Sequence, residues 1–177
     1  ARLGLLISSS LPKRLWPSMP SDPPILGFDP GRSALIEPRS GNDLPEHCVM
    51  TFFWEAAKRA MLEAGGRELA PIRSEMPDIP VYLVEREGRA FALAPAAVGA
   101  PLAGAQLEEL VGRGAKKIVV CGGAGVLDSS IACGEIVVPL SALRDEGTSY
   151  HYMPPGNDSV PCPKALAAIL ETLETRK

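Results

Sequence analysis

A short apolar run followed by glycines constrains the fold of this chain more than any other feature of its sequence. Residues 117–121 read KIVVC and lead directly into the glycine-rich turn CGGAG, residues 121–125. A nearly continuous apolar run of this length is typical of a strand in a buried parallel sheet. A strand pattern at 90–94 and a helical pattern at 101–112 precede it, so the sequence predicts a β-α-β unit.

The other patterns along the chain predict an α/β class. Further strands are expected at 81–85, at 135–143 and, as a strand or a helix start, at 48–53. Gly88 supplies a tight turn between 81–85 and 90–94. Helix 101–112 should place four residues on one face: Ala103, Leu107, Leu110 and Val111.

Two more helices are predicted from apolar residues at helical spacing. One follows Phe53 and ends at Gly65-Gly66, where glycine allows a helix to stop. The other opens at Pro163, a residue favoured in the first turn of a helix. Its inward face is expected to consist of Leu166, Ile169, Leu170 and Leu173.

Length and charge exclude several classes of protein. The 177 residues fit one domain, and 18 Lys+Arg against 21 Asp+Glu give a net charge of -3, which disfavours a nucleic-acid partner. No apolar stretch approaches the ~18–20 residues that cross a bilayer, so no membrane partner is expected. Five prolines in the first 24 residues predict an extended or poorly ordered leader over 1–23, with the domain covering 24–177.

The four cysteines give no sign of a metal site or a disulfide framework. No pair has C-x-x-C spacing, and no two histidines lie three to five residues apart. Free thiols favour a reducing compartment, which predicts a cytoplasmic location. Cys121 and Cys133 are expected to be small buried residues.

Two glycine-rich turns are candidates for an anion site. Ligands of open α/β sheets bind beyond the carboxyl ends of the strands, and glycine lets backbone N–H groups approach an anion closely. The first turn, VGAP at 98–101, contains Gly99 and opens a helix whose free N–H groups point the same way. The second consists of Gly122, Gly123, Ala124 and Gly125. Neither turn has the sequence of a P-loop or of a dinucleotide-binding motif, and tight turns alone would explain both equally well.

A third candidate is the polar segment RDEGTSYHY at 144–152. It follows a predicted strand, and such clusters on loops are typical of ligand sites. Arg144 and Glu146 are its candidate binding residues. The alternative interpretation is a solvated turn with an internal ion pair.

Residues 118–155 resemble the central segment of the nucleoside phosphorylase superfamily, particularly its uridine phosphorylase-like members. That segment runs from a strand through a G-x-x-G turn and an hxxGDhVhP stretch to a strand that ends in R-x-x-G-x-S. The corresponding stretches here are GGAG (122–125), CGEIVVP (133–139) and RDEGTS (144–149). The preceding 99–117 is similar to the family's glycine turn and helix. Upstream, ILGFDPGR at 25–32 is weakly similar to the family's phosphate loop, G-D-P-x-R, which would place Gly27 and Arg32 near phosphate.

The resemblance implies a three-layer α/β/α domain with a mixed central sheet, here incomplete. It also implies a pentosyltransferase: phosphorolysis of a pyrimidine nucleoside to base and ribose 1-phosphate, with inorganic phosphate as co-substrate and no cofactor. The implied partners are nucleoside and phosphate, and a homo-oligomer is expected of the full-length protein. No catalytic residue is identified.

This chain departs from the family pattern in two ways. Val120 and Gly123-Ala124 stand where typical members carry an Arg and a Thr or Ser that contact phosphate. The family's base-recognition and Met-Glu ribose segments would lie beyond residue 177, so we expect little turnover from a chain that ends there. A nucleosidase on the same fold, a non-catalytic nucleoside- or anion-binding remnant and an unrelated α/β domain are the alternatives.

Overall fold

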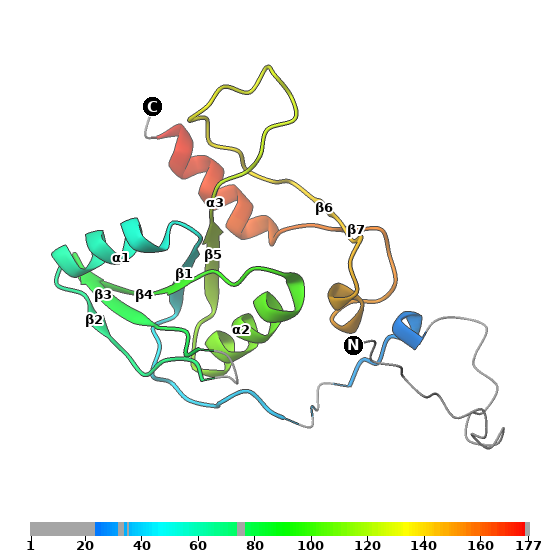
Figure 1. Cartoon of the computed structure of the whole chain (residues 1–177), viewed down its shortest axis with the longest axis horizontal. Coiled ribbons are helices and arrows are strands. Elements are labelled where there is room, and N and C mark those ends of the chain that lie inside the picture. Colours follow the sequence, from blue (N-terminus) through cyan, green and yellow to red (C-terminus); the bar gives the residue numbers. More distant parts are fainter. Residues whose placement is uncertain (1–23, 32–33, 35, 74–76, 176–177) are drawn as a thin grey trace, which may run out of the picture.

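A five-stranded mixed sheet forms the centre of the computed structural model, which describes residues 24–31, 34, 36–73 and 77–175 (Figure 1). The strand order is β2-β3-β4-β1-β5. β1 pairs in parallel with both β4 and β5, whereas β3 pairs antiparallel with β2 and β4. The strands are β1 (His47–Thr51), β2 (Arg67–Glu68), β3 (Tyr82–Arg86), β4 (Arg89–Pro95) and β5 (Lys117–Cys121).

Two helices, α1 (Trp54–Glu63) and α2 (Ala100–Gly112), cover opposite faces of this sheet. Successive side chains of a strand point to opposite faces, and the two packed clusters follow that alternation. On one face α2 packs Leu107 and Leu110 against Cys48, Met50, Val81, Ala92 and Ala94. On the other, α1 packs Trp54, Ala57 and Met61 against Val49, Tyr82, Val84, Phe91 and Leu93. The predicted three-layer α/β/α class with a mixed sheet is therefore confirmed.

Strand β5 has an exposed outer side. It is the last strand of the sheet, and Val119 and Val120 are 43% and 54% exposed. The expectation that 117–121 is buried is therefore wrong at these residues. The strand at 81–85 is buried from Val81 to Val84.

The predicted strand at 135–143 is wrong over most of its length. Residues 135–138 form no strand, and only β6 (Ala142–Leu143) pairs, with β7 (Asp158–Ser159). In Figure 1 the yellow-green segment after β5 extends away from the sheet. Ile136 is 73% exposed, because nothing among the described residues supplies the partner that an extended segment needs.

Several side chains that were expected to be buried are exposed. On α2, Val111 is 57% exposed, while the polar Gln106 is almost completely buried. Cys121 and Cys133 are exposed, and Cys48 is the buried cysteine. Helix α3 (Pro163–Glu174) forms where predicted but buries none of its residues, and Leu170 is 40% exposed. No helix within 24–31, 34, 36–73 and 77–175 has the length and apolar character needed to span a membrane.

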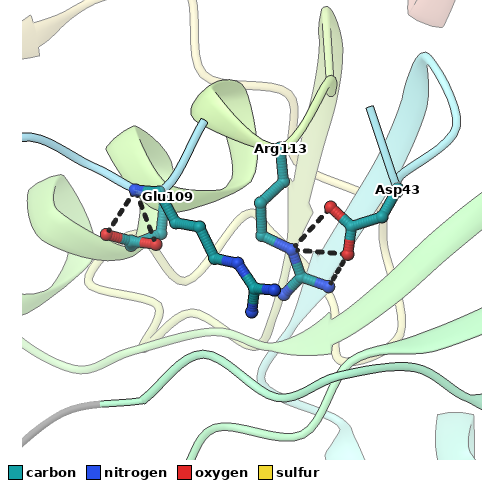
Figure 2. A network of polar contacts seen from close by, with 4 residues as sticks. Asp43, Glu109 and Arg113 are labelled. Atoms are coloured by element: carbon teal, nitrogen blue, oxygen red, sulfur yellow. Dashed lines mark hydrogen bonds and ion pairs between the residues drawn. The ribbon is translucent and has the colours of Figure 1, made fainter. Parts of the chain in front are cut away.

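An ion pair fastens the segment before β1 to the end of α2. Arg113, only 1% exposed, donates from Nε and Nη2 to the Asp43 carboxylate, with Nε 3.0 Å from Oδ2 (Figure 2). Backbone bonds from Gly41 N to Gly112 O and from Leu44 N to Arg113 O run beside it. Within the described part of the chain, Nη1 of Arg113 has no partner, so Asp43 is the counter-charge on which this buried guanidinium depends.

We predict that Asp43→Asn lowers the free energy of unfolding by about 2 kcal/mol, because it leaves the Arg113 charge buried and uncompensated. The hydrogen bond from Arg113 holds the pKa of Asp43 below its ordinary value of 3.8. A lowered pKa means that the contribution is complete above the unfolded value and disappears as pH falls through the folded one. Urea unfolding should therefore show a constant difference between the two proteins from about pH 5 to 8 that shrinks below about pH 4. A difference that persists unchanged in acid would contradict this account.

We predict that Val120→Lys reduces self-association, because a charge within an exposed apolar edge strand opposes edge-to-edge pairing. Stability should change by less than about 0.5 kcal/mol, as at other exposed positions. Sedimentation velocity at several concentrations measures the effect. Val111→Lys, which adds the same charge at an exposed position of α2, is the matched control. An equal response from both variants would show that self-association does not depend on β5.

Candidate functional site

The carboxyl ends of three parallel strands lie side by side. Together they form the edge of the sheet that runs across the strands, and this is the edge meant below. Thr51 at the end of β1 is in register with Pro95 of β4 on one side and Cys121 of β5 on the other. The Phe52 N–H donates to Cys121 O, and the Ala96 N–H donates to Thr51 O, both at 2.9 Å. The two glycine turns, which follow β4 and β5, therefore start from the same edge, separated by the width of β1.

Backbone geometry explains the glycine before α2. Gly99 has φ of 93°, a conformation that favours glycine, and it forms the N-cap of the helix without a side-chain cap. Pro101 stands in the first turn, where its missing N–H costs no helical hydrogen bond. The amino end of α2 therefore points toward this edge with its first N–H groups free of side-chain caps.

The second glycine turn lies against an aromatic side chain. A Cβ atom at Gly122 would stand 2.6 Å from the Phe52 ring, so the close approach requires glycine while that ring stays in place. Phe52 and Phe53 are each about half exposed. Together with 122–125 they give this part of the edge an apolar rim.

An open surface cavity of about 580 Å³ lies beside the amino end of α2. Its volume is in the range of small-molecule sites. It is lined by Ile25 of the short helix η1 (Pro24–Leu26), by Ala100 and Pro101, and by part of the polar segment: Glu146, Gly147, Thr148, His151 and Tyr152. The polar segment thus meets the first glycine turn. Residues 122–125 do not line this cavity, so a pocket shared by both turns remains a prediction.

Glu146 lies on the cavity wall and organises its own loop. Its carboxylate accepts hydrogen bonds from the backbone N–H groups of Thr148 and Ser149, at 2.7 and 3.0 Å from the nearer oxygens. These bonds take up the first two N–H groups of the short helix η2 (Thr148–His151). Hydrogen bonding from Ser149 holds the pKa of the Glu146 carboxyl below its usual value. Like any carboxyl with an ordinary or lowered pKa, it is negatively charged at neutral pH.

Arg144 is buried and holds the polar segment together. Its guanidinium donates to Ser149 Oγ and to three carbonyl oxygens, those of Ser149, Met153 and Pro154, at 2.7–3.2 Å. The same group lies over the Tyr150 ring, 4.5 Å from its centroid. In this conformation the charge serves the loop itself, and a direct role on phosphate remains a prediction.

The remaining candidates are not among the residues that line the cavity, or they lie outside the described residues. Gly27 is exposed and directly follows η1, whose Ile25 lines the cavity. Arg32 lies outside the described residues, as does the leader 1–23. No cluster of three or more His, Cys, Asp or Glu that could hold a metal ion occurs within 24–31, 34, 36–73 and 77–175.

Sequence reasoning did not single out Tyr152, His151 or Gln106. Tyr152 donates to Glu108 Oε1 at 3.0 Å, which joins the polar segment to α2, and burial together with Glu108 raises the pKa of its phenol. An aromatic residue inside a polar cluster was a visible signal for Tyr152 and His151. For Gln106 the signal was its spacing from Ala103 and Leu110, which places this polar residue on the inward face of α2 and predicts a buried carboxamide.

Comparisons with known proteins identify a family and a shared fold. A family model described as Phosphorylase superfamily matches residues 58–177. No curated protein gives a significant match.

Solved structures of nucleoside phosphorylases share the fold. Purine nucleoside phosphorylase from Toxoplasma gondii, in complex with immucillin-H, has a TM-score of 0.66 and 19% identity, over 81% of this chain and 59% of that one. Uridine phosphorylase from Vibrio fischeri ES114 has a TM-score of 0.67 and 24% identity, over 78% and 57%. Its complex with 6-hydroxy-1-naphthoic acid gives 0.64 and 24%, over 76% and 54%. The chain thus spans a little over half the length of these structures.

We predict that Arg144→Met loosens the polar segment, because it leaves three carbonyl acceptors and one hydroxyl without their donor. Limited proteolysis should cut between 144 and 156 several-fold faster, and the free energy of unfolding should fall by about 2 kcal/mol. Asp145→Asn, an exposed neighbour, is the matched control. Equal cleavage of both variants would show that Arg144 does not hold the segment.

Proposed function

Because this chain belongs to the phosphorylase superfamily, we propose that its site binds a nucleoside together with inorganic phosphate and supports phosphorolysis of the glycosidic bond. The observation that carries this proposal is the single edge at which β4, β1 and β5 all end, next to a 580 Å³ cavity. Open α/β sheets bind ligands at such edges. The fold neighbours, purine nucleoside and uridine phosphorylases, support the same class of substrate.

The proposed reaction joins phosphate to the ribose as the base departs. A phosphate oxygen forms a bond to the anomeric carbon, the C–N bond breaks, and its electron pair leaves with the base, which takes up a proton. The transition state has the character of an oxocarbenium ion. Phosphate held beside this developing positive charge stabilises it, and groups that hydrogen-bond the departing base assist further.

Backbone groups are the proposed phosphate ligands. The N–H groups around Gly99 and in Gly122, Gly123, Ala124 and Gly125 suit an anion, with Gly27 and Arg32 as additional contacts. Glu146 carries negative charge and therefore suits ribose hydroxyls or base N–H groups rather than phosphate. Arg144 acts through the loop it holds, with direct contact to phosphate as its second proposed role.

The proposal extends to the substrate, the cellular location and the oligomeric state. We infer a pyrimidine nucleoside as substrate from the uridine phosphorylase-like motifs at 118–155, with phosphate as co-substrate and no cofactor. A cytoplasmic location and a homo-oligomer are proposed for the protein of which this sequence is all or part.

One observation favours a nucleosidase as the second candidate. Val120, half exposed and apolar, stands where a phosphate-contacting Arg was expected, so water could replace phosphate as the nucleophile. A non-catalytic binding protein is the third candidate.

The three candidates predict different ligand binding by the purified chain. Uridine binding, followed by calorimetry with and without phosphate, should be at least several-fold tighter with phosphate if the two ligands share one site. Inosine should bind more weakly than uridine. Any uracil release, measured by chromatography, should require phosphate and remain slow in this chain.

Other outcomes identify the alternatives. Uracil release that is independent of phosphate would assign a nucleosidase. Binding of phosphate without any effect on uridine would leave an anion-binding protein, and binding of neither ligand would overturn the proposal.

A further inference from the structure

Gln106 is the one buried polar side chain on the inward face of α2. It is 1% exposed, among residues that are otherwise apolar on that face, such as Leu107 and Leu110. Burying a carboxamide is unfavourable unless its donor and acceptor both find partners. Both do: the partners are backbone groups of Pro95, the last residue of β4, and of Ala97 in the loop that follows.

The carboxamide of Gln106 clamps the loop between β4 and α2. Its Nε2 donates to Pro95 O at 2.6 Å, and its Oε1 accepts from the Ala97 N–H at 2.9 Å. The residue between them, Ala96, donates to Thr51 O at the end of β1. The last residue of β4 and the two residues that follow it are therefore tied to α2 or to β1.

This loop leads directly to the candidate site. Gly99, the N-cap of α2, lies two residues beyond Ala97, and Ala100 and Pro101 line the 580 Å³ cavity. A neutral carboxamide is suited to the clamp because it offers a donor and an acceptor at once. Leucine would leave both backbone groups unpaired, and a carboxylate would face the Pro95 carbonyl with a second acceptor.

We propose that Gln106 is a positioning residue, which sets the place of the Gly99 turn and of the amino end of α2 for ligand binding. The inference rests on the proposed function, because it assigns the positioning to the nucleoside and phosphate site. Gln106 acts through the backbone of 95–100 and touches no ligand itself.

Two substitutions separate positioning from simple packing. Gln106→Leu has a similar volume and removes both hydrogen bonds at every pH. Gln106→Glu keeps the acceptor for Ala97 and loses the donor while the carboxyl is ionised. Burial raises the pKa of such a carboxyl, and its protonated form again donates to Pro95 O. Val111→Gln, on the exposed face of the same helix, is the matched control.

Amide exchange and uridine binding are the two measurements on the full chain. Exchange at Ala97 should be roughly tenfold faster in Gln106→Leu, the size expected of one buried hydrogen bond, with the strand amides of β1 unchanged. Uridine affinity in the presence of phosphate, relative to the unsubstituted chain at the same pH, should fall by a similar factor. In Gln106→Glu the affinity should be low at pH 8 and recover toward that of the unsubstituted chain as pH falls to about 5.

The results that overturn the inference differ from those that overturn the proposed function. Unchanged exchange at Ala97 in Gln106→Leu would show that the clamp does not hold the loop. Faster exchange with unchanged uridine affinity, or a Gln106→Glu affinity that follows Gln106→Leu at every pH, would show that the clamp does not position the site. Absence of uridine binding by the unsubstituted chain would overturn the proposed function and the ligand half of this inference, while exchange at Ala97 still tests the clamp.

Discussion

The parallel pairing of β1 with both β4 and β5 is the constraint on which the rest of the structure depends. Its register aligns Pro95, Thr51 and Cys121, so the chain leaves three strands at the same edge. Each exit then has a different consequence: α2 begins after β4, α1 begins after β1, and the glycine turn follows β5. A shift of one residue in β1 would exchange its two faces and separate Cys48 and Met50 from the core under α2.

Helix α2 is fixed by polar contacts from its middle turn and from its carboxyl end. Gln106 ties the helix to the loop that enters it, and Arg113 ties its last turn to Asp43 on the segment before β1. The apolar contacts of Leu107 and Leu110 hold the helix on the sheet, but such contacts are non-directional. The polar contacts therefore set where the amino end of the helix, and with it the cavity wall at Ala100 and Pro101, lies along the sheet.

Local patterns in the sequence were sufficient to predict most elements of the sheet and its helices. The glycine turns, the hairpin of β3 and β4 and the helices α1, α2 and α3 all form where short-range spacing placed them. The prediction failed where structure depends on a distant partner: EIVV at 135–138 has the composition of a strand, but no described segment of the chain pairs with it. The prediction that Val119, Val120 and the apolar face of α3 are buried failed for the same reason, because an apolar residue is buried only if another element covers it.

Part of the cavity lining was predicted from the sequence. The motif at 144–152 was recognised as polar and does reach the first glycine turn, although the internal hydrogen bonds of Arg144 could not be inferred from its position in the sequence. The most direct measurement of the central claim is a titration of the isotope-labelled chain with inorganic phosphate, followed by amide NMR. The account predicts saturable shifts at Gly99, Ala100, Leu102 and 122–125. Saturable shifts confined to the opposite end of the sheet, around Arg113, or no saturable shifts at all, would contradict it.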